Sequence, residues 1–201
     1  MQADNVYEVL SQDSIMKNLL DTLSLDDFAT QDSLYHELSA AIVYQQISVK
    51  AADAVYLRFR DLVGWDYLPN QVSNFSVDEL KSCGLSRQKA GYLLNIAEYF
   101  IENKNIEEII ATLNDDEVIT HLTTIKGVGV WTVKMVLMFY LQRQDVFPYE
   151  DLAIAQVLRT LYKISEEKKM AKSEMIAVAE NWKPYRSTAS FYLWAWKRAQ
   201  S

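Results

Sequence analysis

Apolar residues recur at helical spacing along almost the whole chain of 201 residues, and no stretch shows the alternating pattern of a half-buried strand. One clear series is Ala90, Leu93, Leu94, Ala97 and Phe100. Glycine and proline, the residues that interrupt helices, are scarce, with five and three copies. These features predict an all-α fold of roughly ten helices.

Composition narrows the functional classes. The single cysteine, Cys83, excludes an internal disulfide, a cysteine-ligated zinc site and a four-cysteine iron–sulfur cluster. No apolar run reaches the ~20 residues of a membrane span, and no signal peptide is visible, so we expect an intracellular protein. A net charge of −7 counts against nucleic-acid binding. It does not exclude such binding, because helix N-termini bind phosphate through backbone amides.

Capping side chains mark where several helices begin. The expected N-caps are Ser48, Ser76 and Ser86, together with Asp13 or Ser14 and Asn114 or Asp115. Residues 28–30 are expected to be a connector and 64–73 a loop. The charged run 165–172 is expected to be a solvated loop, followed by helices at about 173–181 and 185–199.

Residues 122–151 carry the pattern with the clearest chemical meaning. Gly127 and Gly129 form a turn between helices expected at 117–125 and 130–141. Glycine permits unusual backbone angles and close approach of another backbone. The second helix would direct free N–H groups and a partial positive charge out of the turn, where a phosphodiester can bind. An ordinary corner between two core helices is the alternative.

An acidic pair, Glu150 and Asp151, opens the next helix, and Trp131 lies in the first turn after the glycines. A carboxylate at a helix start is also explained by N-capping alone. The apolar residues after Trp131 are mostly expected to be core. Trp131 is the exception, because it lies near the mouth of the turn.

Five motifs in this order resemble the helix-hairpin-helix DNA glycosylase superfamily, and most closely its 3-methyladenine DNA glycosylase II branch. They are AIVYQQIS (41–48), GLSRQKAGYL (84–93), LTTIKGVGVWTVKM (122–135), DVFPYEDLAI (145–154) and WKPYRSTASFYLW (182–194). The resemblance covers about 40–194. It implies one helical catalytic domain, 1–201, of two lobes with the active-site cleft between them. One lobe is about 30–115; the other combines about 1–29 and 116–201, and the hairpin is 122–135.

The resemblance implies that Asp151 is the catalytic residue. A fixed carboxylate stabilises the positive charge that develops on the sugar as the N-glycosidic bond breaks, and it can orient or deprotonate water. Bifunctional relatives carry a lysine at the position of Trp131. With tryptophan there, water is the expected nucleophile and an abasic site is the expected product.

The resemblance also implies a base pocket, made by Trp131, Met135, Trp194 and Gln45. Aromatic faces attract the electron-poor or cationic alkylated purines 3-methyladenine and 7-methylguanine. Met135 replaces a tyrosine found in a bacterial relative, which leaves the substrate range open. Gln46 matches the wedge that fills the gap left by a flipped base. Hydrogen bonding at a helix end is the alternative for Gln45 and Gln46.

Contacts to the DNA backbone are expected from the hairpin, at Gly127, Gly129, Val130, Lys126 and Lys134. The resemblance implies a monovalent cation, Na+ or K+, on the backbone carbonyls of Thr123, Ile125 and Gly127. Further candidates for the DNA backbone are Arg87, Lys89 and Arg186, with a structural ion pair as the alternative for Arg186. His36 and His121 match no catalytic position and are expected to be structural.

The expected function is that of a monofunctional DNA glycosylase of base excision repair, which removes alkylated purines from damaged double-stranded DNA. It requires no cofactor, contacts no membrane and acts as a monomer, in the cytoplasm with the nucleoid of a bacterium or in a eukaryotic nucleus. One alternative is a glycosylase for uracil, hypoxanthine or ethenoadenine. Another is a helix-hairpin-helix module that binds DNA without catalysis.

Overall fold

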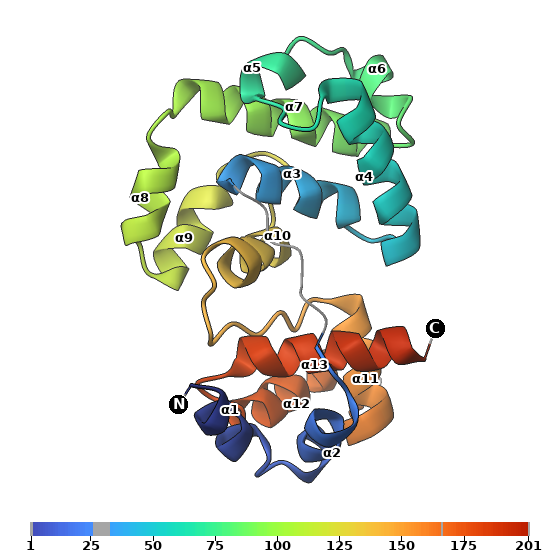
Figure 1. The fold of residues 1–201 in the computed structure, drawn as a ribbon, viewed down its shortest axis with the longest axis vertical. Helices are drawn as coiled ribbons and strands as arrows, with labels where there is room; N and C mark the ends of the chain where they lie inside the picture. Colours follow the sequence, from blue (N-terminus) through green and yellow to red (C-terminus); the bar gives the residue numbers. More distant parts are fainter. Residues whose placement is uncertain (1, 26–32, 166, 201) are drawn as a thin grey trace. The chain divides into compact units, whose positions relative to one another are not determined.

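The computed structural model describes residues 2–25, 33–165 and 167–200, and within them it is helical without any strand (Figure 1). The all-α prediction is therefore confirmed for these residues. They divide into two compact units. One contains the described residues 2–25, 142–165 and 167–200, and the other contains 33–141.

The unit of residues 33–141 is built around α3. Its helices are α3 (Leu34–Tyr44), α4 (Val49–Val63), α5 (Pro69–Val72), α6 (Val77–Lys81), α7 (Arg87–Glu102), α8 (Ile106–Thr112), α9 (Asp115–Leu122), α10 (Val130–Met135) and the π-helix η1 (Val136–Tyr140). Helix α3 contacts α4, α7, α10 and η1, and Figure 1 shows it between α7 and α10. Its sequence, LYHELSAAIVY, is apolar on nearly every side, as expected of a helix buried all round.

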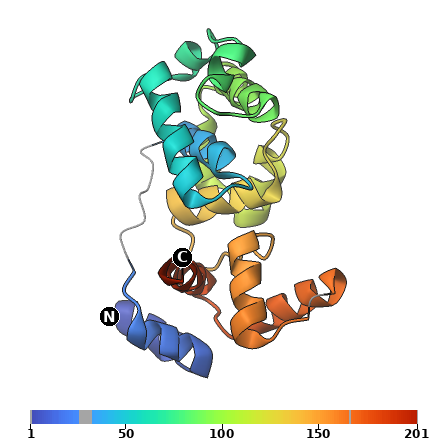
Figure 2. The same cartoon turned by 90° about the vertical axis from the view of Figure 1, so that its right-hand side faces the viewer.

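The other unit joins the two ends of the chain. Its helices are α1 (Gln2–Leu10), α2 (Ser14–Thr22), α11 (Leu152–Tyr162), α12 (Lys168–Glu180) and α13 (Arg186–Ala199). Helix α13 contacts α2 and α11, and Figure 2 views it nearly end on beside α11. The Asp13 carboxylate caps α2 and accepts hydrogen bonds from Trp182 Nε1 at 3.0 Å and Tyr162 Oη at 2.8 Å. The side chain of Asp13 thus joins the start of α2 to two aromatic residues from the C-terminal part of the chain.

The predicted N-caps are confirmed, because each side chain accepts a backbone N–H two or three residues ahead. They are Ser48, Ser76 and Ser86, and within the two open pairs the capping residues are Asp13 and Asn114.

The division between the units differs from the predicted one near 115 and 116. Residues 116–141 cluster with the preceding segment, because α10 and η1 pack on α3. The division therefore follows Leu141. The other predicted boundary, near 29 and 30, and the connector 28–30 lie outside the described residues.

Three local predictions were wrong. The helix expected over 130–141 changes at Val136 into a π-helix, where the N–H of Leu141 bonds the carbonyl of Val136 at 2.9 Å. The expected loop 64–73 contains α5, whose proline begins the helix and whose Val72 is buried. Helix α12 starts inside the charged run, because its buried stripe begins at Ala171. The described residues contain thirteen α-helices and one π-helix, more than the roughly ten helices predicted.

Candidate active site

The hairpin turn, residues 123–129, is held by hydrogen bonds from within and from α7. The N–H of Val128 donates to the carbonyl of Ile125 at 3.0 Å. Asn95 Nδ2 donates to the carbonyl of Lys126, also at 3.0 Å. Gly129 caps α10 without a side-chain hydrogen bond, so the first amides of α10 receive no side-chain cap.

The two glycines of the turn serve different purposes. Gly127 has φ +105°, and a Cβ atom there would lie 2.1 Å from Cγ of Tyr92. Only glycine both adopts this backbone angle without strain and leaves room for the ring of Tyr92. Gly129 has φ −100°, and a Cβ atom there would meet nothing within 4 Å. The protein's own packing therefore does not require glycine at 129, and its open face leaves room for an outside group.

The turn after α3 is tied to the hairpin helix. Gln45 Nε2 donates to Thr132 Oγ1 at 2.8 Å and lies 3.5 Å from the carbonyl oxygen of Gly127. Under the hydrogen-bonding alternative for Gln45, the partner of its side chain is therefore the hydroxyl of Thr132. Gln46 is exposed and has φ +56°, a left-handed conformation that few residues other than glycine adopt.

Several other predicted residues lie on or beside the same hairpin. Trp131 and Lys134 are half-buried on α10, and Lys126 is exposed in the turn. Val130, at the start of α10, is 40% exposed, whereas Met135 is buried.

Lys89, a candidate for contact with the DNA backbone, forms hydrogen bonds within the protein. Its ammonium donates to the carbonyls of Val43 at 2.8 Å and Gln45 at 2.7 Å, at the C-terminal end of α3. Arg186, in the other unit, forms an ion pair with Asp145, with Nε to Oδ1 at 2.6 Å and an η nitrogen to Oδ2 at 3.0 Å. The structural alternative therefore applies to Arg186.

Asp151 is the N-cap of α11. Its Oδ1 accepts the N–H of Ile154 at 2.9 Å and Nε1–H of Trp194 at 3.0 Å. Its own N–H bonds the carbonyl of Pro148 at 2.9 Å, which turns the chain into the helix. The carboxylate is half-buried and held by two fixed donors. Trp194, predicted to face the base, thus contacts the predicted catalytic group.

The segment before Asp151 is anchored to the start of α13 by Ser187, which sequence reasoning missed. The buried Ser187 hydroxyl donates to the carbonyl of Arg143 at 2.6 Å and accepts the N–H of Val146 at 3.0 Å. Tyr92 and Asn95, which shape the hairpin, were missed as well. Ser187 and Tyr92 each lie inside one of the five motifs. The motifs therefore point to the region of these residues, but their roles become visible only from the side-chain contacts.

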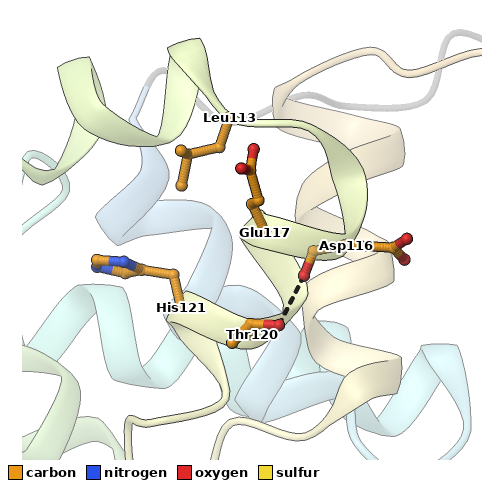
Figure 3. A pocket seen from close by; sticks show the side chains of 5 residues that line it. All are labelled: Leu113, Asp116, Glu117, Thr120 and His121. Carbon is orange, nitrogen blue, oxygen red and sulfur yellow. Dashed lines mark hydrogen bonds between the residues drawn. The ribbon is translucent and has the colours of Figure 1, made fainter.

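An open surface pocket lies elsewhere, along α9. Leu113, Asp116, Glu117, Thr120 and His121 line it (Figure 3). Two of these side chains are carboxylates, which repel phosphate, and His121 Nε2 is already 2.7 Å from the hydroxyl oxygen of Tyr99. Across the described residues, no group of three or more His, Cys, Asp or Glu side chains could bind a metal ion. None of the helices described has the length and apolar composition of a membrane span.

Residues 39–184 match the family model described as "HhH-GPD superfamily base excision DNA repair protein", which is well over half of the chain. The chain belongs to the HhH-GPD superfamily. The matched region of this superfamily includes the hairpin and Asp151 and ends before Trp194.

Named proteins and a solved structure are similar to the chain. DNA-3-methyladenine glycosylase 1 of Schizosaccharomyces pombe is 36% identical over 163 residues, which are 80% of this chain and 71% of that protein. DNA-3-methyladenine glycosylase of Saccharomyces cerevisiae is 33% identical over 90% of this chain and 73% of its own length. The structure of the S. pombe 3-methyladenine DNA glycosylase Mag1 in complex with abasic DNA has a TM-score of 0.84 and 31% identity. It covers 94% of this chain and 95% of that one.

The HhH-GPD residues predicted from the sequence fall into both units. The hairpin, Gln45, Gln46, Trp131 and Met135 belong to the unit of residues 33–141, where hydrogen bonds join the hairpin to Gln45. Asp151 and Trp194 belong to the other unit and are joined by their own hydrogen bond. Each unit thus contains several predicted site residues, and hydrogen bonds connect some of them within the unit.

Proposed function

We propose that the protein is a monofunctional DNA glycosylase of base excision repair that releases alkylated purines from double-stranded DNA. The observation that carries this is the Asp151 carboxylate, held at a helix N-terminus by Ile154 and Trp194, in a chain similar to two named 3-methyladenine DNA glycosylases. An enzyme with this substrate would act in the nucleoid of a bacterium or in a eukaryotic nucleus. It would act as a monomer.

In the proposed reaction, the bond between C1′ and N9 of the purine breaks and the base leaves with the bonding electrons. A cationic base such as 3-methyladenine leaves as a neutral molecule, so its departure needs no proton. The Asp151 carboxylate stabilises the positive charge left on the sugar. Water then adds to C1′ and gives up one proton, to Asp151 or to solvent. With Trp131 where bifunctional relatives carry lysine, no amine is supplied there for a Schiff base.

The remaining roles follow from the hairpin and the turn after α3. The amides of Gly129 and Val130 are proposed to bind a DNA phosphate, with Lys126 and Lys134 nearby. Trp131, Met135, Gln45 and Trp194 are proposed to contact the base, and Gln46 to fill the gap in the duplex.

The hairpin carbonyls also suit a monovalent cation. The carbonyl oxygen of Ile125 accepts a hydrogen bond from the N–H of Val128, and the carbonyl oxygen of Gly127 lies 3.5 Å from Gln45 Nε2. A carbonyl oxygen has two lone pairs, so both can serve a further partner. We propose that these oxygens, with that of Thr123, can bind Na+ or K+, which would supply positive charge toward a phosphate.

A panel of single-lesion duplexes tests the proposal. Excess enzyme is incubated with duplexes containing 3-methyladenine, 7-methylguanine, uracil, hypoxanthine or ethenoadenine, and free base is measured. Release of the first two supports the proposal. Release of another lesion alone would reassign the substrate, and DNA binding without release of any base would indicate a non-catalytic module.

Asp151→Asn separates catalysis from folding. Asparagine is as good an N-cap as aspartate, and its Oδ1 can still accept the two N–H groups, so the fold should be unchanged. Loss of the negative charge should slow base release by about 100-fold or more while DNA binding persists. Glu150→Gln is the matched control, because it removes the neighbouring charge. Equal effects of the two changes would remove Asp151 from the mechanism.

A further inference from the structure

The turn after α3 holds a strained residue at an exposed position. Gln46 has φ +56°, a conformation that residues other than glycine adopt only at a cost in energy. It is exposed, and the apolar side chains that follow, Ile47 and Val49, are 42% and 57% exposed. Strain of this kind persists only where the surrounding structure imposes it, and it is concentrated at functional sites.

Lys89 on α7 contacts the backbone directly before Gln46. Its ammonium donates to the carbonyls of Val43 at 2.8 Å and Gln45 at 2.7 Å. The last carbonyls of a helix have no partners in the helix and carry a partial negative charge, so a cation there is stabilising. Partial burial lowers the pKa of Lys89, which means that its position costs solvation energy that these two carbonyls must offset.

A second tether comes from α10. Gln45 Nε2 donates to Thr132 Oγ1 at 2.8 Å, and Thr132 is buried. Gln45 is therefore fixed through its carbonyl by Lys89 and through its side chain by the hairpin helix. Gln46 follows directly and has little freedom to relax. All these residues belong to the unit of residues 33–141.

We propose that Lys89 is a positioning residue for base extrusion, which holds the turn at residues 45–47 so that Gln46 enters the duplex in a fixed conformation. This inference rests on the proposed function. Lys89 acts through Gln46 and touches neither the base nor the sugar. A wedge ordered in advance avoids the entropy loss of ordering the turn on DNA.

The test compares Lys89→Met with Lys89→Arg in the full chain. Methionine keeps much of the length without the ammonium, and arginine keeps the charge. Single-turnover base release is measured on the same lesion paired normally and placed opposite an abasic site, where extrusion costs less. We expect Lys89→Met to lose roughly ten-fold on the paired lesion and far less on the unpaired one. Lys89→Arg should retain most of the paired rate.

Coupling to Gln46 provides the second readout. Asparagine adopts a left-handed conformation more readily than glutamine. The conformation of the Gln46→Asn variant should therefore depend less on the hydrogen bonds from Lys89. We expect Lys89→Met to cost less in the Gln46→Asn background than in the wild-type background. Equal costs in the two backgrounds, or equal losses on paired and unpaired lesions, would overturn the inference.

A phosphate contact by Lys89 makes a different prediction. Lys89→Met would then weaken binding to undamaged DNA and lower its salt dependence by about one charge. Fluorescence of 2-aminopurine opposite the lesion reports extrusion without catalysis. If the wild-type protein releases no base but changes this fluorescence, the proposed function fails while the positioning role is still decided by Lys89→Met.

Discussion

Replacing Gly127 by alanine tests the hairpin where its packing is tightest. The new Cβ atom would lie 2.1 Å from Cγ and 2.3 Å from Cδ1 of Tyr92, far closer than real Cβ contacts come. The backbone has φ +105° at this position, which alanine adopts only with strain. The hydroxyl of Tyr92 is hydrogen-bonded to the Gln88 side chain, so moving the ring also disturbs that bond.

Two costs therefore add. A left-handed backbone costs a residue other than glycine about 1–2 kcal/mol. Forcing an extra methyl group into a packed region costs about 1–3 kcal/mol more. The free energy of unfolding should fall by about 2–5 kcal/mol, a large part of the ~5–15 kcal/mol that stabilises a typical domain.

Urea denaturation followed by circular dichroism measures the change. Gly129→Ala is the matched control two residues away, since its Cβ would meet nothing within 4 Å, and it should cost no more than about 1 kcal/mol. If the ring causes the loss, Tyr92→Ala should reduce the cost of Gly127→Ala, so that the two changes are not additive. The reasoning is refuted if the two glycine variants are equally stable, or if the double variant is additive.

Two further changes test the other unit and α3. Trp194→Phe removes a donor to a carboxylate, an interaction of about 1.5–3 kcal/mol, so single-turnover base release should slow about 10-fold or more. Trp196→Phe is its control on α13, and equal rates for the two would contradict the role. Burial raises the pKa of Glu37 to about 8, so its folded carboxyl is protonated near neutrality. Over the range from about pH 4.5 to about pH 8, the carboxyl ionises in the unfolded chain but stays protonated in the folded one, so the free energy of unfolding falls progressively as the pH rises. Glu37→Gln, which cannot ionise, should gain a few kcal/mol over wild type across this range; a pH-independent difference in denaturation would refute this.

Most of the fold could be predicted from short-range patterns. Ser76 and Ser86 cap helices through bonds to residues three positions ahead, so the local sequence suffices. The π-helix at Val136–Tyr140 could not be predicted, because its residues are apolar on every side and fit either helical period. The division after Leu141 could not be predicted either, because it depends on α10 and η1 packing against α3, far away in the sequence.

Residue types were easier to predict at the site than residue partners. The glycine turn and the carboxylate at a helix start are visible in the sequence. That Gly127 faces Tyr92, and that Lys89 binds the end of α3, depend on pairs separated by more than thirty residues. The sequence shows that Lys89 is basic, but it does not show that its ammonium donates to the carbonyls of Val43 and Gln45.

The two interpretations of Asp151, helix cap and catalytic group, prove compatible in the structure. The N–H of Ile154 makes it a cap, and that same bond, with Nε1–H of Trp194, fixes the carboxylate on one oxygen. A carboxylate that stabilises a short-lived cation is most effective when its orientation is set before the charge develops. Capping supplies that orientation from the fold itself. Asp151→Asn should therefore retain the helix and lose the reaction, because the cap needs an oxygen and the sugar cation needs a charge.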